Sequence, residues 1–486
     1  MNLKKVAFEA MENYGFKPKF PDSVIDEMEN FSGKIKEAKK SDIRDLRSLL
    51  WSSIDNIDSR DIDQLEYCEL HPRREIRVLV AIADVDCYVG KKTQTDYHAS
   101  HNGTSVYAGV EIFTLFPVRL SWDLTSLNEN EDRLAVVAEF FVRRDGSVRL
   151  GGVFRALVKN KAKLIYEYVG DWLEKKIPCP ENIEKVSGLK EQLLLQDEAA
   201  RRLYRFRMDS GALELETIES TPLIENNHVL DLIVKKKNRA RYLIENFMIT
   251  ANRTMVGFLE KRKIPLIQRI VRVPERWEKI VEVAESLGHR LPMSPDPKAL
   301  SDFLALERRK DPLRFPDLSL SIIKLLGPGE YVMTNSKKGQ RGHFGLAVSD
   351  YTHSTAPNRR YVDLIIQRMM KAVLAGKPSP YNADELSATA SWCTVRDKAA
   401  KKVERFMRKV AGALLLEKHV GEIFDAIVTG ASEKGVYVRI FHPPVEGRVV
   451  RGERNLDVGQ QVKVHLTRID PTKGYIDFEK ENFKVR

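Results

Sequence analysis

The sequence is poor in cysteine and contains no long apolar run. Its 486 residues include only four cysteines, none in a CxxC pair, and no histidine follows at zinc-finger spacing, which argues against a structural zinc site. Scattered cysteines in a long chain are typical of a reducing compartment. No stretch of about 18 consecutive apolar residues occurs, and residues 1–21 lack the apolar core of a signal peptide. We therefore expect a cytoplasmic protein without a membrane span.

Three common catalytic motifs are also missing. The chain has no GxSxG elbow, no GxxxxGK[ST] phosphate loop and no HExxH helix, so the motifs of serine hydrolases, P-loop nucleotidases and zinc proteases are absent. What is present is positive charge. Lysine and arginine number 80 against 69 acidic residues, a formal net charge of +11. This excess favours a polyanionic partner, although many basic proteins bind no nucleic acid.

The order of apolar patterns predicts an α+β protein in three parts. Residues 1–48 show helical periodicity and are expected to form an N-terminal helical segment. Residues 49–417 mix apolar strands, such as the run from Arg77 to Ala83, with long charged helices, and we expect one large mixed domain. Residues 418–486 alternate short apolar runs with glycines, which predicts a small barrel.

A cluster of carboxylates near the start of the large part is the main chemical feature. Four aspartates fall within nine residues: Asp55, Asp58, Asp61 and Asp63. In an extended chain Asp61 and Asp63 point to the same face, and hard oxygen ligands suit magnesium or manganese. An exposed acidic turn is the simpler alternative, but isoleucines interleave with the acids. A calcium loop is rejected because Arg60 stands where that loop needs glycine.

These aspartates lie in a segment that resembles the catalytic domain of the ribonuclease II family. Further blocks resemble that family in the same order, over about residues 50–415. The segments that carry the resemblance are SIDNIDSRDIDQLE (53–66), VLVAIADVDCYV (78–89), GTSVY (103–107), GALELE (211–216), YLIENFMITANRTMV (242–256) and HSTAPNRRYVDLIIQR (353–368). The resemblance implies a large catalytic domain in which strands surrounded by helices form an RNA channel.

The resemblance also implies roles for individual residues. Asp55, Asp61 and Asp63 match catalytic and metal-binding aspartates, and Arg359 matches an arginine beside the scissile phosphate. The fourth aspartate of the family pattern falls at Gln64, whose neutral amide binds a cation less strongly than a carboxylate. The expected cofactor is Mg²⁺, with Mn²⁺ as an alternative.

Two residues of the helical region match positions that contact RNA in the family. Tyr166 matches an aromatic that stacks on a base near the 3′ end, and Glu245 matches an acid near the terminal nucleotide. A helix-packing tyrosine and a solvated glutamate are the alternatives. Leu215 falls where another stacking aromatic is expected, and an aliphatic side chain offers no π-face there.

The helix predicted at 396–410 and the C-terminal barrel supply further RNA-binding candidates. One side of this helix is basic and includes Lys398, Lys402 and Arg405; it could track phosphates or simply be solvated. The tail from Gly421 resembles a five-stranded OB barrel of the type repeated in a ribosomal small-subunit protein. Such barrels bind single strands on exposed aromatics, or they dock other proteins. The candidate contacts in the barrel are Tyr437, Phe441 and His442.

Together these observations predict a metal-dependent 3′→5′ exoribonuclease that hydrolyses single-stranded RNA to nucleoside 5′-monophosphates. The main alternative is a catalytically weak RNA-binding member of the same fold, which Gln64 keeps open. A DNA-directed nuclease is a further alternative. We expect single-stranded RNA as the partner, no membrane association, no inferable protein partner and a monomer.

Overall fold

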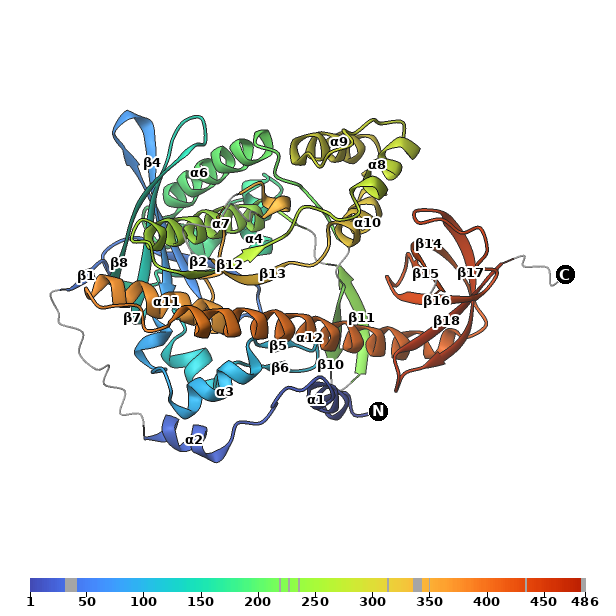
Figure 1. Ribbon diagram of the computed structural model, residues 1–486, viewed down its shortest axis with the longest axis horizontal. Helices are drawn as coiled ribbons and strands as arrows, with labels where there is room; N and C mark the ends of the chain where they lie inside the picture. The colour runs from blue at the N-terminus through green and yellow to red at the C-terminus, as the bar shows by residue number, and fades with distance from the viewer. Residues whose placement is uncertain are drawn as a thin grey trace.

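The computed structural model describes most of the chain and places its helices around one large sheet and one small barrel. The described residues are 1–30, 42–217, 220–225, 228–234, 237–312, 314–334, 343–348, 350–432 and 435–481. In Figure 1 the sheet lies at one end of the molecule and the barrel at the other, joined by the long helix α12 (Ala383–Leu416).

The large sheet has seven strands in the order β1-β8-β7-β4-β3-β2-β9. Its central strand β4 pairs antiparallel with β3 and β7. The apolar run of β4 is buried almost throughout, as expected of a strand that is covered on both faces. The strands are β1 (Ile43–Asp45), β2 (Ser52–Asp55), β3 (Gln64–His71), β4 (Glu75–Ala83), β7 (Asp132–Val142), β8 (Val148–Lys159) and β9 (Ala162–Ile165).

Helices pack against this sheet and contact the last residue of its central strand β4. Phe247 of α7 packs edge-on against Phe140 of β7 with ring centroids 6.2 Å apart, which anchors α7 on the sheet. Gln367 of α11 donates a hydrogen bond of 2.7 Å to the carbonyl of Ala83, the last residue of β4. The helices of this part are α3 (Gln94–Asn102), α4 (Tyr166–Leu173), α5 (Glu181–Glu184), α6 (Leu189–Asp209), α7 (Arg239–Glu260), α8 (Trp277–Ser286), α9 (Pro297–Lys310), α10 (Phe315–Leu326) and α11 (Tyr361–Leu374).

Three two-stranded ribbons complete the large part. They are β5 (Val106–Tyr107) with β6 (Ile112–Phe113), β10 (Ser220–Glu225) with β11 (His228–Val234), and β12 (Leu266–Ile270) with β13 (Glu330–Thr334). Helix α12 begins with a capping box formed by Asn382 and Glu385, which satisfies backbone donors at the start of the helix. At 34 residues α12 is roughly 50 Å long.

The C-terminal strands form a closed barrel in the order β14-β15-β16-β18-β17. Its interior is apolar, with Val438 and Phe478 fully buried. The barrel contacts α10 through an ion pair between Arg439 and Asp317. The strands are β14 (Ile423–Ser432), β15 (Gly435–Ile440), β16 (Glu446–Arg451), β17 (Gln461–Asp470) and β18 (Tyr475–Lys480). The predicted α+β fold with a C-terminal five-stranded barrel is therefore confirmed.

The N-terminal segment contains helices α1 (Leu3–Asn13) and α2 (Asp22–Glu29). Helix α1 buries Ala7 and Met11 in a cluster that includes Val403 of α12. Residues Ile43–Asp45, which the sequence pattern predicts as helical, instead form the strand β1. That prediction is wrong because β1 pairs in parallel with β8, and hydrogen bonding to a neighbouring strand outweighs weak local periodicity.

The division at 48/49 and 417/418 stays a prediction. Within the described residues, no helix combines the length and apolar character that a bilayer crossing requires.

Candidate active site

The three aspartates of the predicted cluster lie around the connection between β2 and β3. Asp55 ends β2, Asp61 lies in the connection, and Asp63 directly precedes β3. Strands β2 and β3 pair antiparallel at Ser52 and Glu66, so the connection between them turns back beside the sheet. The charge of Asp61 acts on both Asp55 and Asp63, so Asp61 lies near each of the other two carboxylates.

The pKa values of the clustered carboxylates are shifted upward. Burial and, after it, the neighbouring charge of Asp61 raise the pKa of Asp55 to about 7. Burial likewise raises the pKa of Asp63, with Asp61 adding to the effect and Arg359 opposing it. Such shifts arise where carboxylates are crowded and poorly solvated, and they are common at functional sites.

Arg359 reaches this cluster from a distant part of the chain. Its Nε donates a hydrogen bond of 3.1 Å to Oδ2 of Asp63. The arginine backbone is fixed as well, because its carbonyl accepts bonds from the amide of Ser105 at 2.9 Å and the hydroxyl of Thr104 at 3.1 Å. The Arg359 side chain remains 40% exposed. Its remaining N–H groups can therefore still meet an anion.

Two buried carboxylate oxygens in the cluster have no hydrogen-bond partner among the described residues: Oδ2 of Asp55 and Oδ1 of Asp63. Buried, unpaired carboxylate oxygens are costly unless a cation compensates them. In the described ranges no three His, Cys, Asp or Glu side chains converge closely enough to hold a metal ion by themselves. Magnesium needs only one or two carboxylates when water and phosphate complete its shell, so this donor set fits such an ion.

Gln64 is the first residue of β3 and is nearly buried, at 9% exposure. Side chains alternate along a strand, so Gln64 shares a face with Glu66 and not with Asp63. Both carboxylate oxygens of Glu66 are buried without a partner. The role of Gln64 as a metal ligand stays a prediction.

Tyr166 opens α4 directly after β9, next to the cluster. The guanidinium of Arg241 lies 4.3 Å from the centre of its ring, and the same arginine donates to Asn56 at 2.9 Å. Burial raises the pKa of Tyr166, and the charge of Asp55 adds to the shift. The structure therefore brings Tyr166 to the aspartates.

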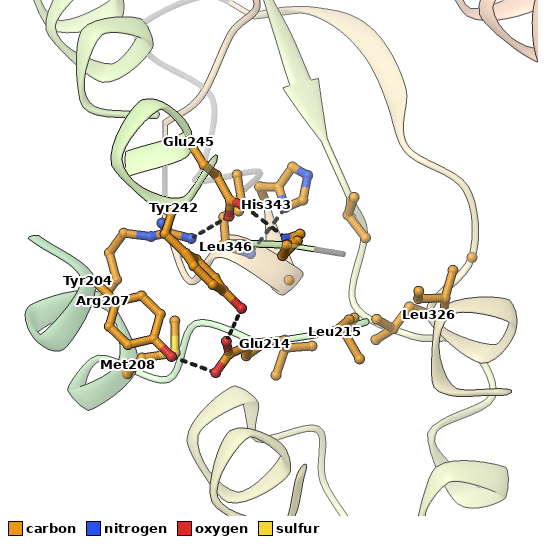
Figure 2. A pocket seen from close by; sticks show the side chains of 16 residues that line it. Tyr204, Arg207, Met208, Glu214, Leu215, Tyr242, Glu245, Leu326, His343 and Leu346 are labelled. Atoms are coloured by element: carbon orange, nitrogen blue, oxygen red, sulfur yellow. Dashed lines mark hydrogen bonds and ion pairs between the residues drawn. The ribbon is translucent and has the colours of Figure 1, made fainter. Parts of the chain in front are cut away.

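Glu245 lies one helical turn after Arg241 on α7. It forms ion pairs with Lys237 at 3.0 Å and Arg207 at 3.9 Å. Figure 2 shows that it borders a pocket, which has a volume of about 240 Å³ and is also lined by Leu215. Residues four apart share a helix face, so Glu245 lies on the same side of α7 as Arg241.

The remaining predicted contacts lie away from the aspartates. Lys398, Lys402 and Arg405 are exposed on α12. In the barrel, Phe441 is 47% exposed and His442 is exposed beside it. Tyr437 lies on β15, with Nζ of Lys409 5.8 Å from its ring centre. These residues could contact RNA outside the catalytic cluster, and their roles stay predictions.

Tyr107 was not among the predicted site residues, although it lies in the block GTSVY. The charges of Arg359, Asp61 and Asp63 all act on its hydroxyl, and Tyr107 in turn lowers the pKa of Asp61. Arg241 was expected only as part of a basic cluster that could contact RNA, and Asn56 only as part of a turn. A tyrosine in a short two-residue strand carries no periodic pattern, so only the quoted motif could have pointed to it.

Comparison with known proteins gives two family matches. The RNB domain model matches residues 43–376, and the RNase II-type exonuclease C-terminal S1 domain model matches residues 422–481. Ribonuclease R of Thermotoga maritima is 30% identical over 94% of this chain and 68% of its own length. Ribonuclease R of Aquifex aeolicus is 28% identical over 96% of this chain and 69% of its own length.

Among solved structures, Mycoplasma genitalium RNase R in complex with ribose-methylated single-stranded RNA has a similar fold. The TM-score is 0.87 at 21% identity, and the alignment covers 99% of this chain and 78% of that one. At this identity the likeness concerns the fold alone.

Proposed function

Because the chain belongs to the ribonuclease II family, with an RNB domain and a C-terminal S1 domain, we propose that it hydrolyses single-stranded RNA from the 3′ end and releases nucleoside 5′-monophosphates. The observation that carries this proposal is the contact between Arg359 and Asp63 beside two buried, unpartnered carboxylate oxygens. A bound cation would neutralise the carboxylates, and a phosphate diester would neutralise the charge of Arg359.

The chemistry is hydrolysis of the phosphodiester bond. A water oxygen attacks phosphorus, the bond from phosphorus to O3′ breaks, and O3′ leaves with a proton. A divalent ion held by Asp55 and Asp63 would activate the water and stabilise the leaving oxygen. Arg359 stabilises the charge that develops on the phosphoryl oxygens, through N–H groups that Asp63 does not occupy. Tyr166 offers a ring for stacking against a base near the 3′ end.

The backbone around Arg359 keeps this group in place. Ser105 and Thr104 hold its carbonyl, and Asp63 accepts a hydrogen bond from its Nε, so both the backbone and the guanidinium are positioned before RNA binds. Preorganisation of this kind lowers the cost of reaching the transition state. Tyr107 lowers the pKa of Asp61, which favours the ionised form of that carboxylate.

The family to which the chain belongs is divalent-metal dependent in general. We propose Mg²⁺ as the ion, with Mn²⁺ as an alternative, because oxygen ligands prefer both. We further propose a monomer in the cytoplasm. The four cysteines are all free thiols, which supports a reducing compartment.

The catalytically weak alternative rests on Gln64 alone and is not favoured, since the three aspartates and Arg359 are all present. The test is incubation of the full chain with 5′-labelled single-stranded RNA and Mg²⁺ or Mn²⁺. The proposal expects a ladder that shortens from the 3′ end and stops in EDTA. Asp63→Asn should bind RNA without degrading it. A shifted but intact RNA with the unaltered chain would contradict the proposal, and equal cleavage of DNA would contradict the RNA preference.

A further inference from the structure

Glu66 is a buried acidic side chain that the described residues leave without a hydrogen-bond partner. It lies on β3, two residues after Gln64, and is 0% exposed. Neither of its carboxylate oxygens has a hydrogen-bond partner within the described ranges. A buried carboxylate is costly unless it is hydrogen-bonded, paired or next to a cation. Glu66 therefore needs a compensating partner.

The two side chains nearest to Glu66 in the sheet and its covering helix are neutral. Ser52 of β2 is its cross-strand partner, and directly opposite residues point to the same face of a sheet. Gln196 of α6 donates from Nε2 to the backbone carbonyl of Glu66 at 3.4 Å. The Ser52 hydroxyl and Oε1 of Gln196 are also buried without a partner in the described part of the chain. Neither neighbour carries a positive charge, so neither compensates the carboxylate.

Glu66 lies close to the aspartate cluster. Asp55 ends the strand on which Ser52 pairs with Glu66. The charge of Asp55 acts on Glu66, and the charges of both carboxylates act on the hydroxyl of Tyr166. Two residues of a strand span roughly 7 Å, which sets the distance from Glu66 to Gln64 along β3. Charges in a buried site interact strongly over such distances, so Glu66 can act on an ion held beside Asp55.

Gln64 and Glu66 complement each other in charge. Gln64 stands where the family pattern has its fourth aspartate, and its amide is neutral. Because side chains alternate along a strand, Gln64 and Glu66 point to the same face of β3. The negative charge that is missing at the first residue of β3 is therefore present two residues further along the same face.

We infer that Glu66 provides the negative charge that Gln64 lacks, and that it raises the affinity of the site for a divalent ion without binding that ion directly. In the described ranges no three acidic, histidine or cysteine side chains converge closely enough to hold an ion, so Glu66 acts as a nearby charge and not as a further ligand. The inference rests on the proposed function for the presence of the ion. It adds a charge-compensating residue that was not among the predicted site residues.

The test measures metal binding by the full chain in the absence of RNA. The protein is stripped of metal with EDTA, dialysed and titrated with Mg²⁺ in a calorimeter. Glu66→Gln removes the charge and keeps the shape, so it should raise the Mg²⁺ Kd by about tenfold, the scale of changing a residue that surrounds the ligands. In cleavage assays the Mg²⁺ concentration for half-maximal rate should rise by the same factor. The kcat at saturating Mg²⁺ should stay nearly unchanged, because a filled site no longer reports affinity.

Three further variants separate charge from packing. Adding Gln64→Asp to Glu66→Gln moves the carboxylate to the first residue of β3 and should restore the Mg²⁺ Kd. Glu66→Asp retains the charge and should bind Mg²⁺ more tightly than Glu66→Gln, although it leaves more empty space. Glu69→Gln is the matched control on the same strand. Glu69 lies on the opposite face and pairs with Arg77 at 2.5 Å, so its loss should leave the Mg²⁺ Kd unchanged.

A protonated Glu66 that only packs beside Ser52 and Gln196 is the structural alternative, and it predicts no change in Mg²⁺ affinity. If the unaltered chain degrades RNA and Glu66→Gln binds Mg²⁺ equally well, the inference is wrong and the proposed function stands. An equal loss in Glu69→Gln, or no recovery in the double variant, would also overturn the inference, because the effect would not follow the position of the charge. If the unaltered chain binds Mg²⁺ through Glu66 but leaves RNA intact, the proposed function fails while the role of Glu66 stands.

Discussion

The side chain of Arg359 donates to Asp63 across 296 positions of sequence, at a distance of 3.1 Å. The pair joins the loop before α11 to the start of β3. The Arg359 side chain is 40% exposed, so its guanidinium both pairs with a buried acid and can still bind an anion through its other N–H groups.

This double role predicts the effect of changing the arginine. Arg359→Lys keeps the charge but loses the planar fork of donors, and it should lower kcat by about 10²–10³-fold, the scale of removing one transition-state donor. KM should change little. The measurement is single-turnover cleavage of 5′-labelled RNA, with Arg73→Lys as a matched surface control. An unchanged rate would remove Arg359 from the catalytic set.

The unpartnered oxygens of Asp55 and Asp63 predict coupling between metal and stability. Mg²⁺ should raise the melting temperature of the unaltered chain, since a ligand at a hundredfold excess over its Kd adds about 2.7 kcal/mol. Asp63→Asn removes a buried charge and should stabilise the metal-free chain while reducing the response to Mg²⁺. Thermal unfolding with and without EDTA checks both. Identical Mg²⁺ responses in the two proteins would contradict a site at Asp63.

Arg396 of α12 connects the N-terminal segment to the loop that holds Arg359. It donates to the carbonyl of Tyr14 at 3.2 Å and stacks 3.8 Å from the ring centre of Phe16. On its other side it lies against Gly103, where an added Cβ would come within 2.9 Å of the Arg396 Cβ. The next two residues hold the carbonyl of Arg359.

We predict that Arg396→Leu lowers kcat by about tenfold with little change in KM. The substitution would let Arg359 shift, and a small displacement of a catalytic group lowers the rate substantially. Arg396→Lys should recover only part of the loss, since it cannot stack as a plane. Steady-state kinetics on one RNA checks this, with Ser391→Ala on the same helix as the control. A rise in KM alone would indicate an effect on RNA binding instead.

Three buried or partly buried histidines predict loss of stability in mild acid. Burial lowers the pKa of His98 and of His343 to about 4, and holds that of His353 well below its usual value. Because the pKa of these histidines is lower in the folded chain, the unfolded chain binds protons at a higher pH than the folded chain does. The stability is therefore complete above about pH 6.5 and declines below it, at up to about 1.4 kcal/mol per pH unit for each histidine.

Urea unfolding between pH 7 and pH 4.5 measures this decline. His98→Asn should flatten the curve by removing one of the three groups. A stability that rises as the pH falls from 6.5 to 5 would contradict the assignment.

Local pattern accounts for much of the fold and for part of the site. The apolar run of β4, the helical stretch of α12 and the alternating tail were predicted from periodicity, which reports burial on one or both faces. Asp55, Asp61 and Asp63 lie within nine residues, so their chemistry could be proposed before their geometry was known. By contrast, β1 was misassigned, since its strand character comes from pairing with β8.

The acidic cluster, the excess positive charge and the resemblance to a family could all be read from the chain before folding, because each depends on residue type and short spacing. The approach of Arg359 and Tyr107 to the aspartates and the contact of Arg396 with their loop became visible only in the folded chain, since these contacts join segments tens to hundreds of residues apart. Their energies depend on burial and orientation, which exist only after the chain has closed around them.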